Sequence, residues 1–396
     1  MKIAIVSQLY KPFFKGGAEI SSELLARGLK SAGHEVFVIS SAVGGAKPGA
    51  DEVDGIVVHR LRTGLPYDVM SSGPKPKWAK ALWHAIDIWN PTVFAAVRKL
   101  LRAERPDVLH TNVIVGLSTS VWSAARAAGV PVVHTLRDYY LLCVRSLLCK
   151  ANGQVCQRLC GPCRFFSVCQ RPRSRSVGAV VGISRFVLEK HREFGFFRNT
   201  PGHVIHNAVL GESVAPRSKP VGGPLEMVFL GTVEPYKGVG VVLDALAQSP
   251  SLPVRLHICG GGAGLESLRA RCAGDPRVIF EGIVQGERKR AIIAGADVML
   301  VPSVWFEPFG RTVIEGYQQG LVVVGSRIGG IPELIEDGVT GRLFDPGNSQ
   351  QLRAVLEDLV AQPERLATMK QRAVAKAQSF SLAKHAQDYL AVYKTL

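Results

Sequence analysis

Residues 297–315 read DVMLVPSVWFEPFGRTVIE, and this stretch decides the fold. The apolar run over 297–302 is typical of a buried strand, and a helix-like run follows the loop and extends to Gly320. This pattern places Glu307 on a loop at the carboxyl end of a parallel strand. It places Glu315 within the next helix, near its start.

The start of this helix has the features of an anion site. The N–H groups of Phe309, Gly310 and Arg311 open the helix, and the arginine adds a cation beside them. The flanking carboxylates of Glu307 and Glu315 suit hydroxyl-rich groups such as a ribose and a sugar. Taken alone, the stretch leaves two interpretations open: a nucleotide-sugar pocket, or an ordinary strand–loop–helix unit with two solvated glutamates.

Residues 227–238, MVFLGTVEPYKG, repeat the pattern upstream. The apolar run 227–230 predicts a buried strand, and Gly231 ends it. Lys237 and Gly238 then open a helix. A lone Lys-Gly pair is usually a solvated turn, but ligands of a doubly wound sheet bind at the carboxyl ends of its strands. The ammonium of Lys237 is therefore expected at the ligand-binding edge.

Two further motifs follow, GGIPE at 329–333 and DGVTGRL at 337–343. The order G-T-x-E-x-x-K-G, E-P-F-G-x-x-x-x-E, G-G-I-P-E, D-G-x-x-G-x-L resembles the retaining glycosyltransferases of family 4, the glycosyl transferases group 1. The resemblance covers most of residues 225–396. It implies the α/β architecture called GT-B: two Rossmann-like doubly wound domains face a cleft, and a C-terminal helix crosses back to the first domain.

The expected domain limits follow the alternation of strands and helices along the chain. The first, acceptor-side domain begins with a βαβ unit over residues 2–40 and contains a less ordered stretch over 42–91 with Trp78, Trp83 and Trp89. The expected organisation is an acceptor-side domain at 1–210 with a basic, Cys-rich insertion at about 141–176, a linker at 211–223, a nucleotide-sugar domain at 224–380 and a returning helix at 381–396.

The resemblance implies a role for each motif. Transfer breaks the bond between a sugar and a diphosphate, so the growing negative charge of the diphosphate must be stabilised. In this family cations and backbone N–H groups do so, and no metal or other cofactor is required for the chemistry. Glu307 is expected to contact the donor sugar and Glu315 the ribose. The expected catalytic residues are Glu307, Lys237, Asp138 and Arg137, and the expected donor-binding residues are Gly16, Gly17, Thr232, Phe309, Gly310, Arg311 and Glu315.

The sequence departs from the family pattern at two positions. Thr232 stands where an arginine is usual, so Lys237 is expected to carry more of the electrostatic load. In HTLRDYY at 134–140, Arg137 holds the position where a histidine commonly faces the donor sugar. Either Arg137 contacts the donor or acceptor, or Asp138 does the polar work. His110, at another strand end, is more readily explained as a structural histidine.

The charge of the chain predicts an anionic partner. The 48 Lys and Arg against 32 Asp and Glu give a net charge of +16. Ten of these cations fall within 145–192 beside one acid, Glu189. Because no nucleic-acid motif is present, this clustering favours an anionic membrane surface. No apolar run reaches the length of a spanning helix, so we expect a cytoplasmic protein on the cytoplasmic face of the membrane.

Six of the eight cysteines fall within 143–169. The tightest set, C-x3-C-x2-C-x5-C, is Cys156, Cys160, Cys163 and Cys169. In a cytosolic protein such a cluster is more often a metal site than disulfides, and four thiolates suit a structural zinc. An iron–sulfur cluster fits less well. Because the spacing matches no known zinc module, free thiols in a loop stay open as the alternative.

The sequence as a whole favours an enzyme of the hexosyltransferase type. It would move a sugar from a UDP- or GDP-linked donor to a glycan or lipid-linked saccharide, in polysaccharide or glycolipid biosynthesis. The alternative is an inactive GT-B scaffold that binds membrane or nucleic acid through its basic Cys-rich loop. The intact Glu307, Glu315 and Lys237 favour the enzyme.

Overall fold

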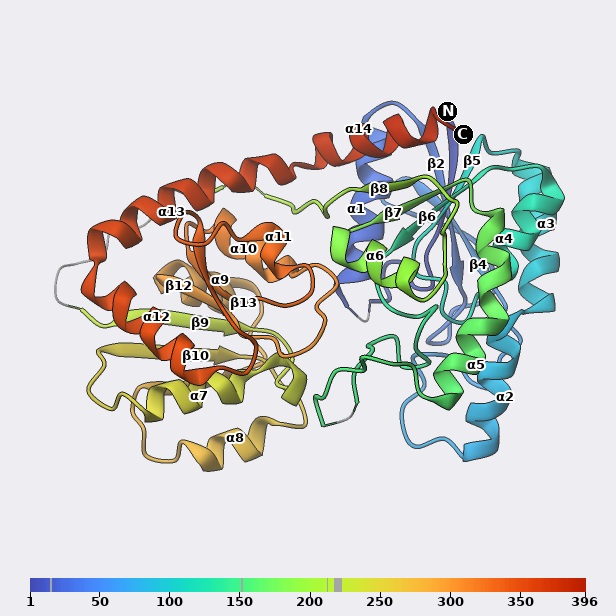
Figure 1. Cartoon of the computed structure of the whole chain (residues 1–396). Coiled ribbons are helices and arrows are strands. Elements are labelled where there is room, and N and C mark those ends of the chain that lie inside the picture. Colours follow the sequence, from blue (N-terminus) through green and yellow to red (C-terminus); the bar gives the residue numbers. More distant parts are fainter. Residues whose placement is uncertain (15, 151, 212, 217–222) are drawn as a thin grey trace. The chain divides into compact units, whose positions relative to one another are not determined.

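The structure, a computed structural model, describes residues 1–14, 16–150, 152–211, 213–216 and 223–396. The chain divides into two compact units (Figure 1). Unit 1 comprises Met1–Leu148, Gln157–Ala208 and Leu382–Leu396, and unit 2 comprises Cys149–Cys156 and Val209–Ser381. Of the predicted linker, residues 212 and 217–222 lie outside the described residues.

Unit 1 is built on one eight-stranded sheet in the order β3-β4-β2-β1-β5-β6-β7-β8. All neighbours run parallel except the β3–β4 hairpin. The strands are β1 (Lys2–Val6), β2 (Glu35–Ser41), β3 (Gly49–Val53), β4 (Ile56–Leu61), β5 (Val108–Thr111), β6 (Val132–Leu136), β7 (Ala179–Gly182) and β8 (Gly202–Val204). The helices are α1 (Gly17–Ser31), α2 (Lys77–Ile88), α3 (Pro91–Glu104), α4 (Ser120–Ala128), α5 (Gly161–Gln170), the 3-10 helix η1 (Arg171–Ser176), α6 (Arg185–Glu193) and α14 (Leu382–Tyr393).

The stretch over 42–91 is partly regular: residues 42–48 and 62–76 lie outside helices and strands, as the expectation of a less ordered region had it, and most of the remainder forms regular elements. It contains the β3–β4 hairpin and the whole of α2. The glycines that indicated irregular chain form turns, since Gly55 has a φ of +71° in the two-residue hairpin loop. Trp83 packs inward with 6% of its surface exposed, whereas Trp78 is 68% exposed.

Unit 2 contains a fully parallel six-stranded sheet in the order β11-β10-β9-β12-β13-β14. Counted from β9, this is the 3-2-1-4-5-6 order of a doubly wound sheet, and the order reverses between β9 and β12. The strands are β9 (Leu225–Leu230), β10 (Val254–Cys259), β11 (Val278–Gly282), β12 (Val298–Val301), β13 (Val322–Ser326) and β14 (Gly341–Phe344). The helices are η2 (Pro235–Lys237), α7 (Val239–Ala247), α8 (Leu265–Arg271), α9 (Gly286–Gly295), α10 (Arg311–Gln318), α11 (Ile331–Leu334), α12 (Ser349–Ala361), α13 (Pro363–Ala377) and η3 (Gln378–Phe380).

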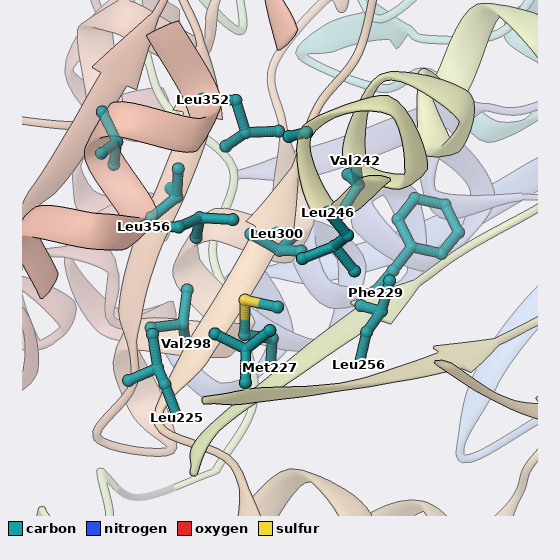
Figure 2. Packing of buried hydrophobic residues seen from close by; sticks show 14 of the residues in the cluster. Leu225, Met227, Phe229, Val242, Leu246, Leu256, Val298, Leu300, Leu352 and Leu356 are labelled. Atoms are coloured by element: carbon teal, nitrogen blue, oxygen red, sulfur yellow. The ribbon is translucent and has the colours of Figure 1, made fainter. Parts of the chain in front are cut away.

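The core of unit 2 forms where helices cover the central strands. Figure 2 shows Met227 of β9 and Leu300 of β12 beside Leu246 of α7 and Leu356 of α12, all fully or almost fully buried. Burying such side chains stabilises the fold by about 1.5–3 kcal/mol each. This burial fixes the two central strands, and with them the points at which the loops at their carboxyl ends begin.

The last helix, α14, belongs to unit 1, as the GT-B expectation required. Leu382 and Ala386 pack against Gly28 of α1, where a Cβ would lie only 3.0 Å from the Leu382 side chain. Two tyrosines of α14 reach a buried polar pair on the sheet: Tyr393 Oη contacts His110 Nδ1, and Tyr389 Oη lies 3.0 Å from Thr135 Oγ1. His110 is fully buried, so it has the structural role favoured by its sequence context.

Candidate active site

The loops that follow β9 and β12 meet at the point where the strand order reverses. The Val304 N–H donates to the Tyr236 carbonyl at 3.0 Å, which ties one loop to the other. Gly238 has a φ of +75°, and a Cβ there would lie 1.8 Å from the Pro302 carbonyl oxygen. Only glycine fits this position, which explains the Lys-Gly pair of the motif.

Lys237 and Glu307 form the centre of this edge. Lys237 Nζ donates to Glu307 Oε2 at 2.8 Å, and their side chains are 23% and 16% exposed. The same oxygen accepts from Trp305 Nε1 at 3.1 Å and Ser303 Oγ at 3.4 Å. The ammonium also lies 5.2 Å from the centroid of the Trp305 ring. Two residues predicted from separate motifs are thus brought into direct contact.

The GGIPE motif packs against the backbone of the Glu307 loop. Gly329 has a φ of +61°, and a Cβ there would lie 2.3 Å from the Glu307 carbonyl oxygen. The Gly330 N–H donates to that same oxygen at 2.8 Å. The paired glycines therefore fix the backbone of the loop, and with it the position of the carboxylate.

Helix α10 begins at Arg311, after Gly310 in a left-handed conformation with φ +95°. Arg311 Nε donates to Glu315 Oε1 at 2.9 Å, one turn along the helix. The two predicted donor contacts are therefore paired with each other. The buried Nη1 of Arg311 has no hydrogen-bond partner among the described residues. Phe309 is 3% exposed, so its side chain belongs to the core and only its backbone is available.

Thr232 lies on the loop after β9 and is exposed. Its neighbour Gly231 packs closely against the glycine loop after β10, because a Cβ on Gly260 would lie 1.8 Å from the Gly231 carbonyl oxygen. Thr232 offers a hydroxyl where the family usually has a guanidinium. Lys237 and Arg311 are then the cations present on the two loops.

In unit 1 the strand order reverses at β1, which lies between β2 and β5. The glycines predicted to bind donor follow β1: Gly16 precedes α1, and Gly17 is its first residue. The Gly16 N–H donates to Glu19 Oε2 at 2.9 Å. This bond satisfies one of the free N–H groups at the helix start. Lys15 lies outside the described residues.

Arg137 is held inside unit 1 by two asparagines. It is 5% exposed, its Nε donates to Asn112 Oδ1 at 2.8 Å, and its Nη1 donates to Asn207 Oδ1. Asn112 follows β5 and Asn207 follows β8, so the guanidinium joins three strand ends. Nothing in the sequence motif pointed to these asparagines.

Asp138 is half-buried beside Arg137, and its Oδ1 accepts from the Tyr140 N–H at 2.8 Å. Burial raises the pKa of Asp138 to about 6, and the charge of Glu19 adds to the rise. A carboxyl group with this pKa can hold or release a proton near neutral pH. Both residues line a small cavity together with Asn112, His134, Tyr140 and His191.

The eight cysteines, all among the described residues, form no disulfide, and of the predicted quartet Cys163 is buried and Cys160 exposed. The Cys163 thiol lies near those of Cys143 and Cys160, and its closeness to Cys143 raises the pKa of Cys163. Cys143 was not among the predicted zinc ligands. Within the described residues, no three His, Cys, Asp or Glu side chains are arranged to hold a metal ion.

Comparison with known proteins decides the family. A profile of the glycosyl transferases group 1 matches residues 214–376, and a profile of the glycosyl transferase 4-like domain matches residues 16–208. The chain belongs to the glycosyl transferases group 1. It is therefore a glycosyltransferase of GT-B architecture, as the motifs predicted.

Two relatives and one solved structure illustrate the similarity. An uncharacterized 42.6 kDa protein in the cps region of Klebsiella pneumoniae is 30% identical over 340 residues, 84% of this chain and 87% of that protein. A D-inositol 3-phosphate glycosyltransferase of Arthrobacter sp. (strain FB24) is 25% identical over 92% of this chain and 86% of that protein. Anabaena Alr3699/HepE, solved in complex with UDP, superposes with a TM-score of 0.75 at 22% identity over the whole of both chains.

Among the helices that the structure describes, none combines the length and the apolar composition required to cross a bilayer.

Proposed function

We propose that this glycosyltransferase moves a sugar, with retention of its anomeric configuration, from a UDP- or GDP-linked donor to a glycan or lipid-linked saccharide. The observation that carries the proposal is the Lys237–Glu307 pair at the reversal of strand order in unit 2. Ligands of doubly wound sheets bind at this point. The Anabaena protein that shares the fold was solved with UDP and with UDP-glucose, which supports a nucleotide-sugar donor.

The leaving diphosphate is assigned to Lys237 and the start of α10. An ammonium has three N–H donors, so Lys237 can keep its bond to Glu307 and still donate to a phosphate oxygen. Arg311 and the backbone N–H groups of Phe309 and Gly310 provide further donors there. Stabilising charge on the leaving group is the largest contribution such a site can make. Glu307 is assigned to the hydroxyls of the donor sugar and Glu315 to the ribose, with Thr232, Gly16 and Gly17 as additional donor contacts.

Arg137 and Asp138 are assigned to the acceptor-side unit, where the family commonly has a histidine. The hydrogen bonds that Arg137 donates to Asn112 and Asn207 fix the guanidinium, and the Tyr140 N–H holds the neighbouring Asp138 carboxyl group. With its raised pKa, Asp138 is suited to receive a hydrogen bond or a proton from a sugar hydroxyl. No group in this scheme requires a metal ion.

The acceptor class is inferred from the relatives and from charge. The Klebsiella relative is described as a protein of a cps region, which supports a role in polysaccharide biosynthesis. The excess of Lys and Arg within 145–192 supports peripheral association with the cytoplasmic face of an anionic membrane, where a lipid-linked acceptor would be presented.

A titration with UDP, GDP and ADP tests the donor assignment. We expect one diphosphate to bind in the micromolar range and product analysis by NMR to show a retained anomeric configuration. The proposal fails if none of the three nucleotides binds to the folded protein, or if the transferred sugar has the inverted configuration.

The zinc site at Cys156, Cys160, Cys163 and Cys169 stays a prediction. It requires about one zinc per chain by elemental analysis and a lower melting temperature after strong chelation. It also requires that Cys160, an exposed residue, be protected from alkylation in the native protein. Metal-free protein in which iodoacetamide modifies Cys160 rapidly would overturn it.

A further inference from the structure

A large cavity lies at the amino edge of the sheet in unit 1. It has a volume of about 970 Å³ and is lined in part by Gly178, just before β7, and Pro201, just before β8. Arg137 and Asp138 follow β6, at the opposite, carboxyl edge of the same parallel sheet. The cavity is therefore separate from the residues assigned to transfer, and no motif of the family includes it.

The cavity is strongly basic. Arg171, Arg175 and Arg198 line it, and no aspartate or glutamate does so. None of the three arginines forms an ion pair with another described residue; Arg171 only donates to the Phe194 carbonyl at 3.5 Å. Like charges around a concave surface focus a positive potential. Guanidinium groups in such a place match the geometry of phosphate oxygens.

One wall of the cavity carries an exposed apolar side chain and has others beside it. Val168 of α5 lines the cavity and is 46% exposed, and Phe165, one turn earlier, is 67% exposed. Helix α2 lies beside α5 (Figure 1), with the rings of His84 and Phe166 at 6.1 Å, and its Trp78 is 68% exposed. Large apolar side chains next to unpaired cations are typical of a surface that enters a lipid interface.

We propose that this cavity binds the phosphate-bearing headgroup of an anionic membrane lipid, with Phe165 and Val168 inserted among the neighbouring lipids. The inference rests on the membrane association proposed above and gives it a defined place. Diffuse attraction by the segment 145–192 would not involve Arg198, which lies outside it. A headgroup site needs Arg198, because its side chain lines the same cavity as Arg175.

Co-sedimentation with vesicles of phosphatidylglycerol or phosphatidylcholine tests the proposal. The test variant is Arg175→Ser/Arg198→Ser, whose side chains are both exposed. The control is Lys99→Ser/Arg126→Ser, which removes the same charge from exposed positions on α3 and α4. We expect the test variant to bind phosphatidylglycerol about 25-fold more weakly, roughly fivefold for each lost cation, and the control to change by less than about twofold. Phe165→Ser/Val168→Ser should remove the binding that survives high salt.

UDP binding is measured on each variant as well, so that a failure of the lipid-site inference can be told from a failure of the transferase proposal. Four outcomes would overturn the inference. Equal losses in test and control variants would show diffuse attraction without a headgroup site. Glycerol 1-phosphate bound as tightly as vesicles would identify a soluble phosphoester as the ligand. If the protein bound a soluble anionic polysaccharide more tightly than it binds vesicles, the ligand of the cavity would be a polysaccharide and not a lipid. If wild-type protein bound both kinds of vesicle equally poorly, the proposal of membrane association would itself be wrong.

Discussion

Lys237 Nζ lies 2.8 Å from Glu307 Oε2, although 70 positions separate the two residues in the chain. Each stands at the carboxyl end of one of two adjacent strands, β9 and β12. Trp305, Ser303 and the backbone of Gly330 hold the glutamate from other sides. The pair is therefore fixed by the protein's own contacts, which is the preorganisation that its proposed role in electrostatic catalysis needs.

Removing either member of this pair should abolish most of the transfer. We expect Lys237→Ala and Glu307→Ala each to lower kcat by about 100-fold or more, the effect of removing one preorganised charge-stabilising group. Because the residues act together, the double variant should lose little beyond the worse single variant. Arg290→Ala, an exposed cation on α9, serves as control. Near wild-type transfer by either single variant, with an unchanged melting temperature, would remove both residues from the site.

We expect Glu315 to strengthen the binding of the nucleoside part of the donor and not the binding of its diphosphate part. In the proposed role Glu315 hydrogen-bonds the ribose, so Glu315→Ala should weaken nucleoside diphosphate binding by about 1–3 kcal/mol. The same change frees Arg311 from its carboxylate partner, so binding of inorganic diphosphate should stay equal or improve. Calorimetric titration with both ligands measures the difference. A parallel loss for both ligands would place Glu315 against the phosphates or in a purely structural role.

The raised pKa of Asp138 predicts a pH dependence of stability. Its pKa is about 6 in the folded protein, against about 3.9 for an aspartate in an unfolded chain. The folded state therefore holds this proton more tightly. The stabilising contribution is complete below pH ~4 and is lost as the pH rises through ~6. Compared with Asp138→Asn, the wild-type free energy of unfolding should fall between these pH values in denaturant titrations. If the difference in free energy of unfolding between wild type and Asp138→Asn did not change with pH, Asp138 would be an ordinary, solvated carboxyl group.

Much of unit 2 was predictable because its motifs are local. Gly310 of E-P-F-G permits a left-handed turn and Gly329 of G-G-I-P-E a close backbone approach, so the spacing of these motifs indicates the strand ends that position Glu307. The pairing of Lys237 with Glu307 was not predictable, since it depends on which strands are neighbours. The loop residues Trp305 and Ser303 carried no signal beyond their nearness to Glu307 in the sequence.

Unit 1 was less predictable because its contacts join distant segments. Asn112 and Asn207 reach Arg137 from other strand ends, and short polar residues at such positions are usually loop residues. The hairpin and helix within 42–91 are hard to predict because glycines and prolines are frequent there, and such residues indicate irregular chain as readily as tight turns. The cysteine spacing likewise gave no indication that Cys143 contacts Cys163.

The role of Gly329 can be isolated by comparing it with Gly347. Both have a positive φ, +61° and +81°, so alanine is strained at either position. A Cβ on Gly347 meets no atom within 4 Å, whereas one on Gly329 would lie 2.3 Å from the Glu307 carbonyl oxygen. Gly347→Ala should therefore cost only about 1–2 kcal/mol of stability and leave transfer unchanged.

Gly329→Ala must also displace the Glu307 loop. We expect a larger loss of stability than for Gly347→Ala and a loss of kcat of about 100-fold, because small shifts of a positioned group have large effects on rate. Denaturant titration and initial rates of transfer measure the two quantities on the same preparations. Equal stabilities and equal rates for the two variants would mean that the Glu307 loop can shift to accommodate the added Cβ without a cost in free energy. The position of the Glu307 carboxylate would then not depend on the backbone packing of the GGIPE motif.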